Sequence, residues 1–239
     1  MAEAQDIFQY LPLSFKTPSE QEYIEFLWSS FDSNYQNGKF QFAFLAYHMM
    51  YMSAVYFNIW QINKSQNEDF KKALIGFEKE QDIFNATSPF TYSIENESRI
   101  FNFLKLIGCD NSKIGRYKKI VRDRNEIAHT NGNIPYKAKD SIDRKIDEII
   151  DLLEEIQIHS EPMVKDILIK FLKDYADESN WEYSDVSDQI KEILIHKNYM
   201  SNKDIEHLLK FKVNVLSKDE GFDEMKELFN SFTDTYSNT

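Results

Sequence analysis

The sequence predicts an all-α protein: a helical bundle followed by a C-terminal helical extension. Glycine and proline are scarce, at 6 and 5 of 239 residues, which suits long helices better than a turn-rich β protein. Apolar residues recur at helical spacing in nearly every segment. Hydrophobic residues make up 42% of the chain, and aromatic residues 15%, which is too apolar for a disordered chain and enough for a sizeable core.

The N-terminal part is predicted to be an arm followed by a capped helix. Residues 1–16 are apolar and are expected to lie on the core. In the next helix, Thr17 can act as the cap, Pro18 suits the first helical position, and Glu20 would complete a capping box. The sequence QNGKF at 36–40 then breaks the chain.

The segment 40–62 contains no formally charged residue and is long enough to span a bilayer. Polar side chains are nevertheless scattered through it, namely Gln41, His48, Ser53, Asn58 and Gln61. One helical stripe gives this apolar rod a hydrogen-bonding face, and it consists of Tyr47, Tyr51, Ala54, Asn58 and Gln61. We therefore predict a buried central helix with His48 as a core histidine, and no membrane span.

Three shorter elements are expected next. Residues 68–79 carry a short helical pattern, and 85–93 (NATSPFTYS) are rich in turn formers and are predicted to be a loop. Residues 94–108 are predicted to form one helix, because their apolar residues are spaced for burial on one side.

Two helices with clear boundaries follow. The first covers about 111–129, with Asp110 or Asn111 as its cap and the pair Asn131-Gly132 as its stop. The second begins at 139 and is the most regular amphipathic helix of the chain. Its apolar stripe consists of Ile142, Ile146, Ile149, Leu153 and Ile156.

The pattern changes after Pro162. We divide the chain into a helical bundle at 1–159 and a helical extension or small subdomain at 160–239. Shorter helical patterns are expected in the extension at about 163–177, 186–197, 202–211 and 221–232.

The N-terminus has no basic region and carries Glu3 and Asp6, so it does not resemble a secretion signal. Cys109 is the only cysteine, which excludes an internal disulfide framework and fits a reducing compartment. We predict a cytoplasmic protein. Cys109 ends a helical pattern, where the helix dipole disfavours a thiolate, so a structural role is expected for it.

One basic segment stands out in an acidic chain. The net charge of −12 repels nucleic acid, so any polyanionic partner must be bound locally. Residues 113–124 carry six basic side chains and one acidic one. The basic residues are Lys113, Arg116, Lys118, Lys119, Arg122 and Arg124.

His129 follows at the end of the same helix, where a charged imidazole is favoured. Asn125 lies four residues earlier on the same face and could orient the ring. Arg122 lies almost in line with His129, whereas Arg124 lies about 140° around an ideal helix. Two interpretations stay open: a site for acid–base chemistry on a phosphodiester, or a solvated basic face on which His129 bonds helix-end carbonyls.

Acid–base cleavage of RNA needs both a base and an acid, and one chain offers one plausible histidine. A two-fold dimer would place two copies of His129 and several arginines in one cleft. The chemistry therefore predicts an isologous homodimer. No pair of histidines has a convincing metal-ligand spacing, and no phosphate-binding glycine loop is present, so no metal or cofactor is predicted.

The hexapeptide RNEIAH at 124–129 resembles the R-x4–6-H motif of HEPN domains, the higher eukaryotes and prokaryotes nucleotide-binding family. The resemblance covers roughly residues 20–159. It implies a metal-independent endoribonuclease that dimerises, of the kind found in toxin–antitoxin and anti-phage defence systems, with RNA as substrate and an antitoxin or defence protein as a further partner.

By the same resemblance, Arg124 would stabilise the phosphate, Asn125 would be the polar residue that follows it, and His129 would be the catalytic imidazole. Arg122 also fits the wider spacing, as R-x6-H, so the key arginine stays open. The remaining substrate contacts are expected from Arg116, Lys118, Lys119 and Arg122. Some members of the family are inactive, so a non-catalytic module that binds a protein partner or a nucleotide is the alternative.

Overall fold

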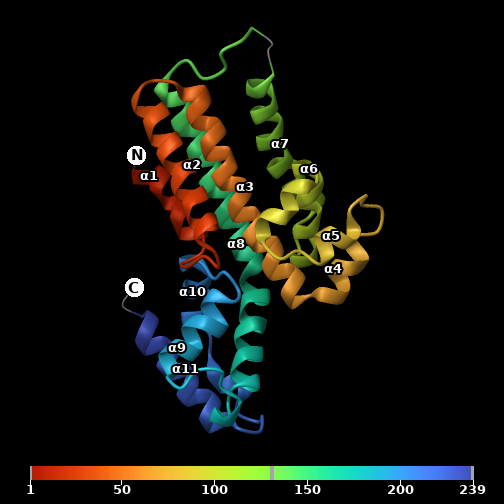
Figure 1. Ribbon diagram of the computed structural model, residues 1–239, viewed down its shortest axis with the longest axis vertical. Helices are drawn as coiled ribbons and strands as arrows, with labels where there is room; N and C mark the ends of the chain where they lie inside the picture. The colour runs from red at the N-terminus through yellow and green to blue at the C-terminus, as the bar shows by residue number, and fades with distance from the viewer. Residues whose placement is uncertain (1, 130–131, 238–239) are drawn as a thin grey trace.

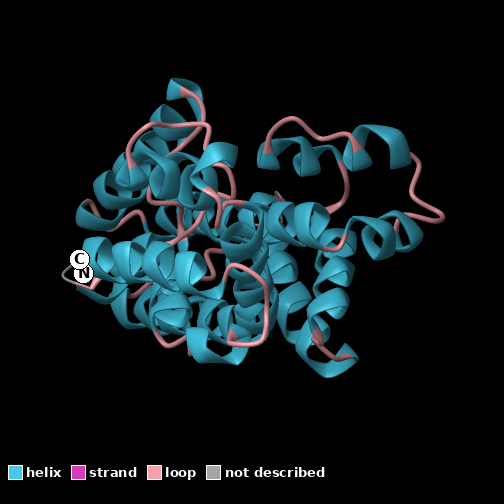
Figure 2. Cartoon of the chain, turned by 90° about the horizontal axis from the view of Figure 1, so that it is seen from below, coloured by secondary structure: helices cyan, strands magenta, loops and turns pink. Residues whose placement is uncertain are grey.

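The computed structural model describes residues 2–129 and 132–237. Every regular element in these residues is a helix, as Figure 2 shows by the absence of strands from the part that it colours. The predicted all-α class is confirmed.

The helices fall into a bundle and a C-terminal part. The bundle contains α1 (Ala2–Gln5), η1 (Asp6–Tyr10), α2 (Pro18–Gln36), α3 (Phe40–Ser65), α4 (Asn67–Ala73), α5 (Glu80–Phe84), η2 (Pro89–Ile94), α6 (Glu97–Ile100), η3 (Phe101–Ile107), α7 (Asn111–Ala128) and α8 (Lys139–Asp174). The C-terminal part contains η4 (Glu178–Asn180), α9 (Val186–Gln189), η5 (Ile190–His196), α10 (Asn202–Leu209), η6 (Val213–Leu216) and α11 (Phe222–Tyr236). The long helix α8 runs through both parts (Figure 1).

Helix α3 is the centre of the bundle, as predicted for the uncharged segment. Of its 26 residues, 19 are buried, and α2, α7 and α8 all pack against it. His48 is buried to 1% exposure, which confirms it as a core histidine. None of the helices in the described ranges is both long and apolar enough to cross a membrane.

The start of the bundle agrees with the prediction in part. The N-terminal arm lies on the core, with Ile7 and Leu11 buried. The Thr17 hydroxyl accepts a hydrogen bond from the Glu20 amide at 3.3 Å, which makes Thr17 the cap of α2. The predicted capping box is not formed, because the Glu20 carboxylate is buried and accepts instead from the amide of Lys16 at 3.1 Å.

Two predictions in the middle of the chain are wrong. The expected loop at 85–93 contains the short helix η2, which starts where the Ser88 hydroxyl caps the amide of Phe90. The expected single helix at 94–108 begins only at Glu97, after the cap Asn96, and then tightens into η3. The tighter winding places the buried Phe101, Leu104 and Ile107 in line, three residues apart, which the α-helical spacing of 3.6 residues per turn does not predict.

Helix α8 also differs from the prediction. Residues 163–177 were expected to form a separate helix, but α8 continues through Pro162 to Asp174, so the boundary at 159/160 falls inside one helix. Pro162 is exposed, and the carbonyl that its missing amide would have bonded belongs to Ile158, which is 56% exposed. Water can therefore replace the lost hydrogen bond. The predicted stripe at 142–156 is buried as expected.

A buried polar network joins the C-terminal part to the bundle. The Asp204 carboxylate of α10 accepts hydrogen bonds from Gln61 of α3 at 3.0 Å and from Gln157 of α8 at 2.5 Å. It also accepts from the amide of Ser201 at 2.8 Å, which completes a capping box for α10. Because the carboxylate and its donors are buried and bonded to one another, the C-terminal part is held in one position on α3 and α8.

Candidate functional site

The predicted site lies on α7, and the helix forms much as expected. The Asp110 carboxylate caps it by accepting from the amide of Lys113 at 2.9 Å. Helix α7 ends at Ala128, within one residue of the prediction. Of the predicted stop, Asn131 lies outside the described residues, and Gly132 has a φ of +75°.

His129 is the residue at which the chain leaves α7. Its backbone is extended, its side chain is exposed, and its amide donates to the carbonyl of Asn125 at 3.1 Å. The C-terminal end of α7 lies at the end of the molecule opposite to the C-terminal helices (Figure 1). The imidazole is therefore accessible to a ligand or to a second protein.

Arg124 occupies a different environment from His129. It is half-buried, and its guanidinium forms an ion pair with the Glu97 carboxylate of α6. Glu97 also accepts a hydrogen bond from the Nε2 of His48 at 3.0 Å. The arginine of RNEIAH is thus paired with a carboxylate that also bonds a core histidine, and it is not paired with His129.

The titration of this cluster follows from its burial. Burial lowers the pKa of His48, so the buried ring is held neutral and donates to Glu97. Burial alone would raise the pKa of Glu97, but the hydrogen bonds from His48 and Arg124 outweigh it and lower that pKa. Glu97 is therefore a carboxylate that fixes the position of Arg124.

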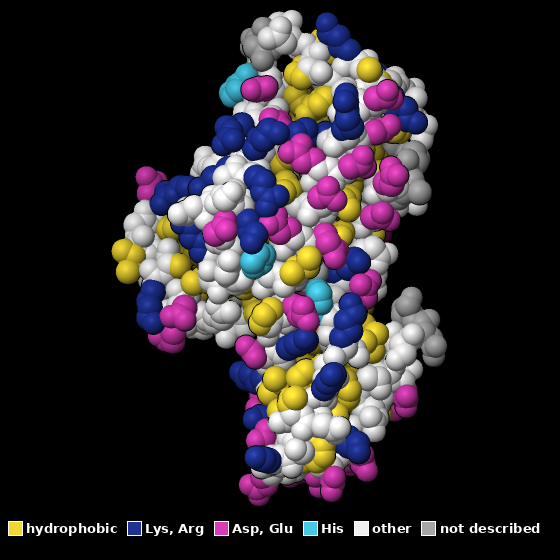
Figure 3. Space-filling model, turned by 180° about the vertical axis from the view of Figure 1, so that it is seen from behind, with side chains coloured by type: hydrophobic (Ala, Val, Ile, Leu, Met, Phe, Trp, Pro, Cys, Tyr) yellow, Lys and Arg dark blue, Asp and Glu magenta, His cyan; other side chains and the backbone are white. Residues whose placement is uncertain are grey.

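The basic face of α7 is largely ion-paired within the chain. Arg116 forms two hydrogen bonds of 2.6 Å to the carboxylate of Glu155, and Lys119 lies 3.4 Å from Glu148. Both acids belong to α8, and Figure 3 shows acidic and basic side chains lying next to one another over this side of the bundle. The positive charge of the segment is thus partly neutralised before any partner binds.

The two remaining predicted contacts differ. Lys118 is half-buried and donates to the side-chain oxygen of Asn102 at 3.0 Å. Arg122 is exposed and forms no ion pair with any described residue. Of the predicted site residues, Arg122 and His129 are exposed and form no ion pair with a described residue, and Asn125 lies between them in the chain and is half-buried.

Glu97 is the residue that the sequence reasoning missed. It lies 27 residues from Arg124 and 49 residues from His48 along the chain, so no local spacing indicates the cluster. Its only local signal is its position after the cap Asn96. In the part of the chain that the structure describes, no group of three or more His, Cys, Asp or Glu side chains is arranged to hold a metal ion.

Comparison of the chain with protein-family models, with curated proteins and with solved structures finds no match. The candidate site is therefore defined by its own geometry: an exposed imidazole at the end of α7, and an arginine of the same helix that is held by a carboxylate of α6.

Proposed function

We propose that the protein is a HEPN-type, metal-independent endoribonuclease that cleaves RNA by acid–base transesterification. The observation that carries the proposal is the exposed His129 at the end of α7, which follows an arginine, Arg124, that Glu97 holds in place. An accessible imidazole supplies proton transfer, and a fixed guanidinium supplies charge for a phosphate.

The roles of the two arginines follow from their surroundings. Arg124 has five N–H donors, and the pair with Glu97 leaves some of them to bind a phosphate oxygen. Arg122 is exposed and has no carboxylate partner among the described residues, so it can bind RNA without breaking an existing contact. We assign phosphate stabilisation to Arg124 and substrate binding to Arg122.

The proposal includes an isologous homodimer. One chain presents one exposed histidine at this end, whereas transesterification needs an acid and a base. A two-fold axis near the end of α7 would supply the second imidazole from a second copy. In this arrangement the protein would act as a toxin or an anti-phage defence effector, and an antitoxin would work by covering the same end of the helix.

The experiment is an RNA-cleavage assay with the full chain in the presence of EDTA. Wild-type protein is expected to leave cyclic-phosphate ends, and His129→Ala is expected to reduce the rate by about 100-fold or more, the usual contribution of a general acid or base. His159→Ala is the matched control, because His159 lies on α8 outside the motif. Equal cleavage by His129→Ala and wild type would remove the proposal.

A second candidate function is a non-catalytic module that binds a protein or a nucleotide. The observation that favours it is the pairing of Arg116 and Lys119 with the acids of α8, since paired cations contribute less to RNA binding. Absence of RNA cleavage, together with a salt-sensitive protein complex that is lost in Lys118→Glu and Lys119→Glu, would support this candidate.

A further inference from the structure

A cavity of about 740 Å³ lies between α2, α3 and η2, away from the exposed end of α7. Its lining includes Lys16, Glu20 and Tyr199, as well as Glu97, the partner of Arg124. A volume of this size accommodates an organic small molecule. The proposed nuclease chemistry does not use this cavity, and the inference drawn from it does not depend on that proposal.

The carboxylate of Glu20 is already satisfied by the protein. It is 6% exposed and accepts hydrogen bonds from the Ser88 hydroxyl at 2.6 Å and from the Tyr199 hydroxyl at 2.9 Å, in addition to the Lys16 amide. The Ser53 hydroxyl in the wall donates to the carbonyl of Met49 at 2.8 Å. Glu20 and Ser53 therefore already have hydrogen-bond partners within the protein and do not need a ligand to supply them.

The ammonium group of Lys16 is the exception. It lies 4.3 Å from the centre of the Tyr199 ring and 4.6 Å from that of the Trp60 ring, and it forms no ion pair with a carboxylate of the described chain. The ammonium group of Lys64 also lies over the Trp60 ring, at 4.4 Å from its centre. The aromatic rings hold Lys16 in place, and the nearby Glu20 carboxylate does not come within ion-pair distance of the ammonium.

The wall also carries hydroxyl side chains, from Thr17, Ser19, Thr87 and Ser93, and an apolar and aromatic part. Met52 and Tyr56 of α3 form its base with 2% and 6% exposure, and Met49 stands at the rim with 43% exposure. The rings of Tyr23 and Phe90 meet edge to face at 5.2 Å. Such a surface stabilises a flat or flexible apolar group by burial.

We propose that this cavity is a binding site for a small organic anion with an apolar body. The anionic group would pair with the Lys16 ammonium, and the apolar body would lie over Met49, Met52 and Phe90. A neutral ligand would form no ion pair with Lys16, and an anion without an apolar body would leave the base of the cavity unfilled.

The test uses two fluorescent dyes that differ in charge. 8-Anilinonaphthalene-1-sulfonate carries a sulfonate, and N-phenyl-1-naphthylamine has the same rings without it. Wild-type protein is expected to bind the sulfonate dye saturably, at one site, and more tightly than the neutral dye. Lys16→Met is expected to lower the affinity for the sulfonate dye by about tenfold, because one charge-assisted contact is lost. The affinity for the neutral dye is expected to stay unchanged.

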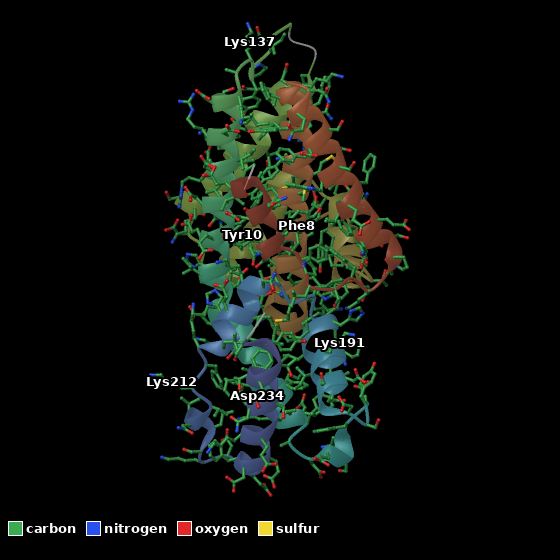
Figure 4. The ribbon with its side chains drawn as sticks, turned by 90° about the vertical axis from the view of Figure 1, so that its left-hand side faces the viewer. Phe8, Tyr10, Lys137, Lys191, Lys212 and Asp234 are labelled. Atoms are coloured by element: carbon green, nitrogen blue, oxygen red, sulfur yellow. The ribbon has the colours of Figure 1, made fainter. Side chains whose placement is uncertain are left out.

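Three further variants make the result specific. Lys16→Arg keeps the positive charge and is expected to bind the sulfonate dye within about threefold of wild type. Met49→Trp fills the rim of the cavity and is expected to lower the affinity for both dyes. Lys212→Met is the control, because Lys212 is exposed at the edge of the C-terminal part (Figure 4). Equal affinity of wild type for both dyes, or unchanged sulfonate binding in Lys16→Met or Met49→Trp, overturns the proposal.

A pH titration of wild-type protein tests the same site without a substitution. Burial lowers the pKa of Lys16 to about 8, although nearby Glu20 raises it, and Lys64 and Lys197 lower it further. The sulfonate stays charged throughout, so affinity for this dye is expected to fall as the pH rises past 8. The fourth facing group, Tyr199, has a pKa that burial raises, so it stays neutral in this range. A pH-independent affinity for the sulfonate dye contradicts the assignment.

Discussion

The two ends of α3 meet polar groups of very different kinds. At its C-terminal end, Gln61 bonds the buried Asp204, and every partner of that carboxylate is buried as well. Nearer its N-terminal end, His48 contacts Glu97, whose partner Arg124 is only half-buried and is followed by the exposed His129. The first arrangement fixes the position of one part of the fold on another, whereas the second leaves a helix end accessible to a partner.

The largest effect is expected at the buried network. Asp204→Ala removes the carboxylate that accepts hydrogen bonds from the buried side-chain amides of Gln61 and Gln157. The loss of these hydrogen bonds is expected to lower the unfolding free energy by about 3–5 kcal/mol. Urea unfolding measures the loss. Glu206→Ala is the control on the same helix, because Glu206 is exposed and pairs only with Lys203 at the surface within the described chain, and its cost is expected below about 1 kcal/mol. Equal losses would mean that burial does not distinguish the two acids.

A smaller effect is expected at the half-buried cluster. Glu97→Gln removes the charge that holds Arg124 but keeps an acceptor for His48, and about 1–2 kcal/mol of unfolding free energy is expected to be lost at pH 7. Because the folded protein lowers the pKa of Glu97, its contribution is present above the ordinary value of 4.5 and is lost as the pH falls through the folded value.

The same urea measurement at low pH checks this prediction, since wild type and Glu97→Gln are expected to converge there. Asp69→Asn is the control, because Asp69 pairs with Lys72 on an exposed surface. A difference between wild type and Glu97→Gln that persists after the carboxylate is protonated would contradict the role assigned to the charge.

The third prediction concerns the pH dependence of stability. Burial lowers the pKa of His48 below its ordinary value of 6.5, so the unfolded chain binds a proton there before the folded protein does. Stability is therefore expected to fall as the pH decreases below about 6.5, and His48→Gln is expected to flatten this part of the curve. His207→Gln offers the comparison in the C-terminal part, because burial lowers that pKa too. Identical slopes for wild type and His48→Gln would contradict the prediction.

The smallest effect on stability is expected at the exposed helix end. His129 is exposed and its backbone amide makes the local hydrogen bond, so His129→Ala is expected to change the unfolding free energy by less than about 0.5 kcal/mol. Thermal unfolding followed by circular dichroism checks this value. A large loss would show that His129 supports the fold, and loss of RNA cleavage in the variant would then say nothing about catalysis.

Much of the helical organisation was predictable from the sequence. The uncharged segment at 40–62 indicated a central helix because only a buried environment suits such a composition, and α3 extends to Ser65. The cap Asp110 and the periodicity after it indicated α7, since both signals act within a few residues of each other. The break expected near Pro162 was wrong, because an exposed proline can be tolerated when water satisfies the carbonyl that it leaves.

The sequence by itself determined the fold class, the central helix and the place of the RNEIAH motif at a helix end, since helix periodicity and capping are local properties. Only the tertiary structure decided that Glu97 holds Arg124, that the acids of α8 neutralise Arg116 and Lys119, and that a cavity forms beside Lys16. These contacts join residues far apart in the chain, and they depend on how the helices pack, which no spacing along the sequence records.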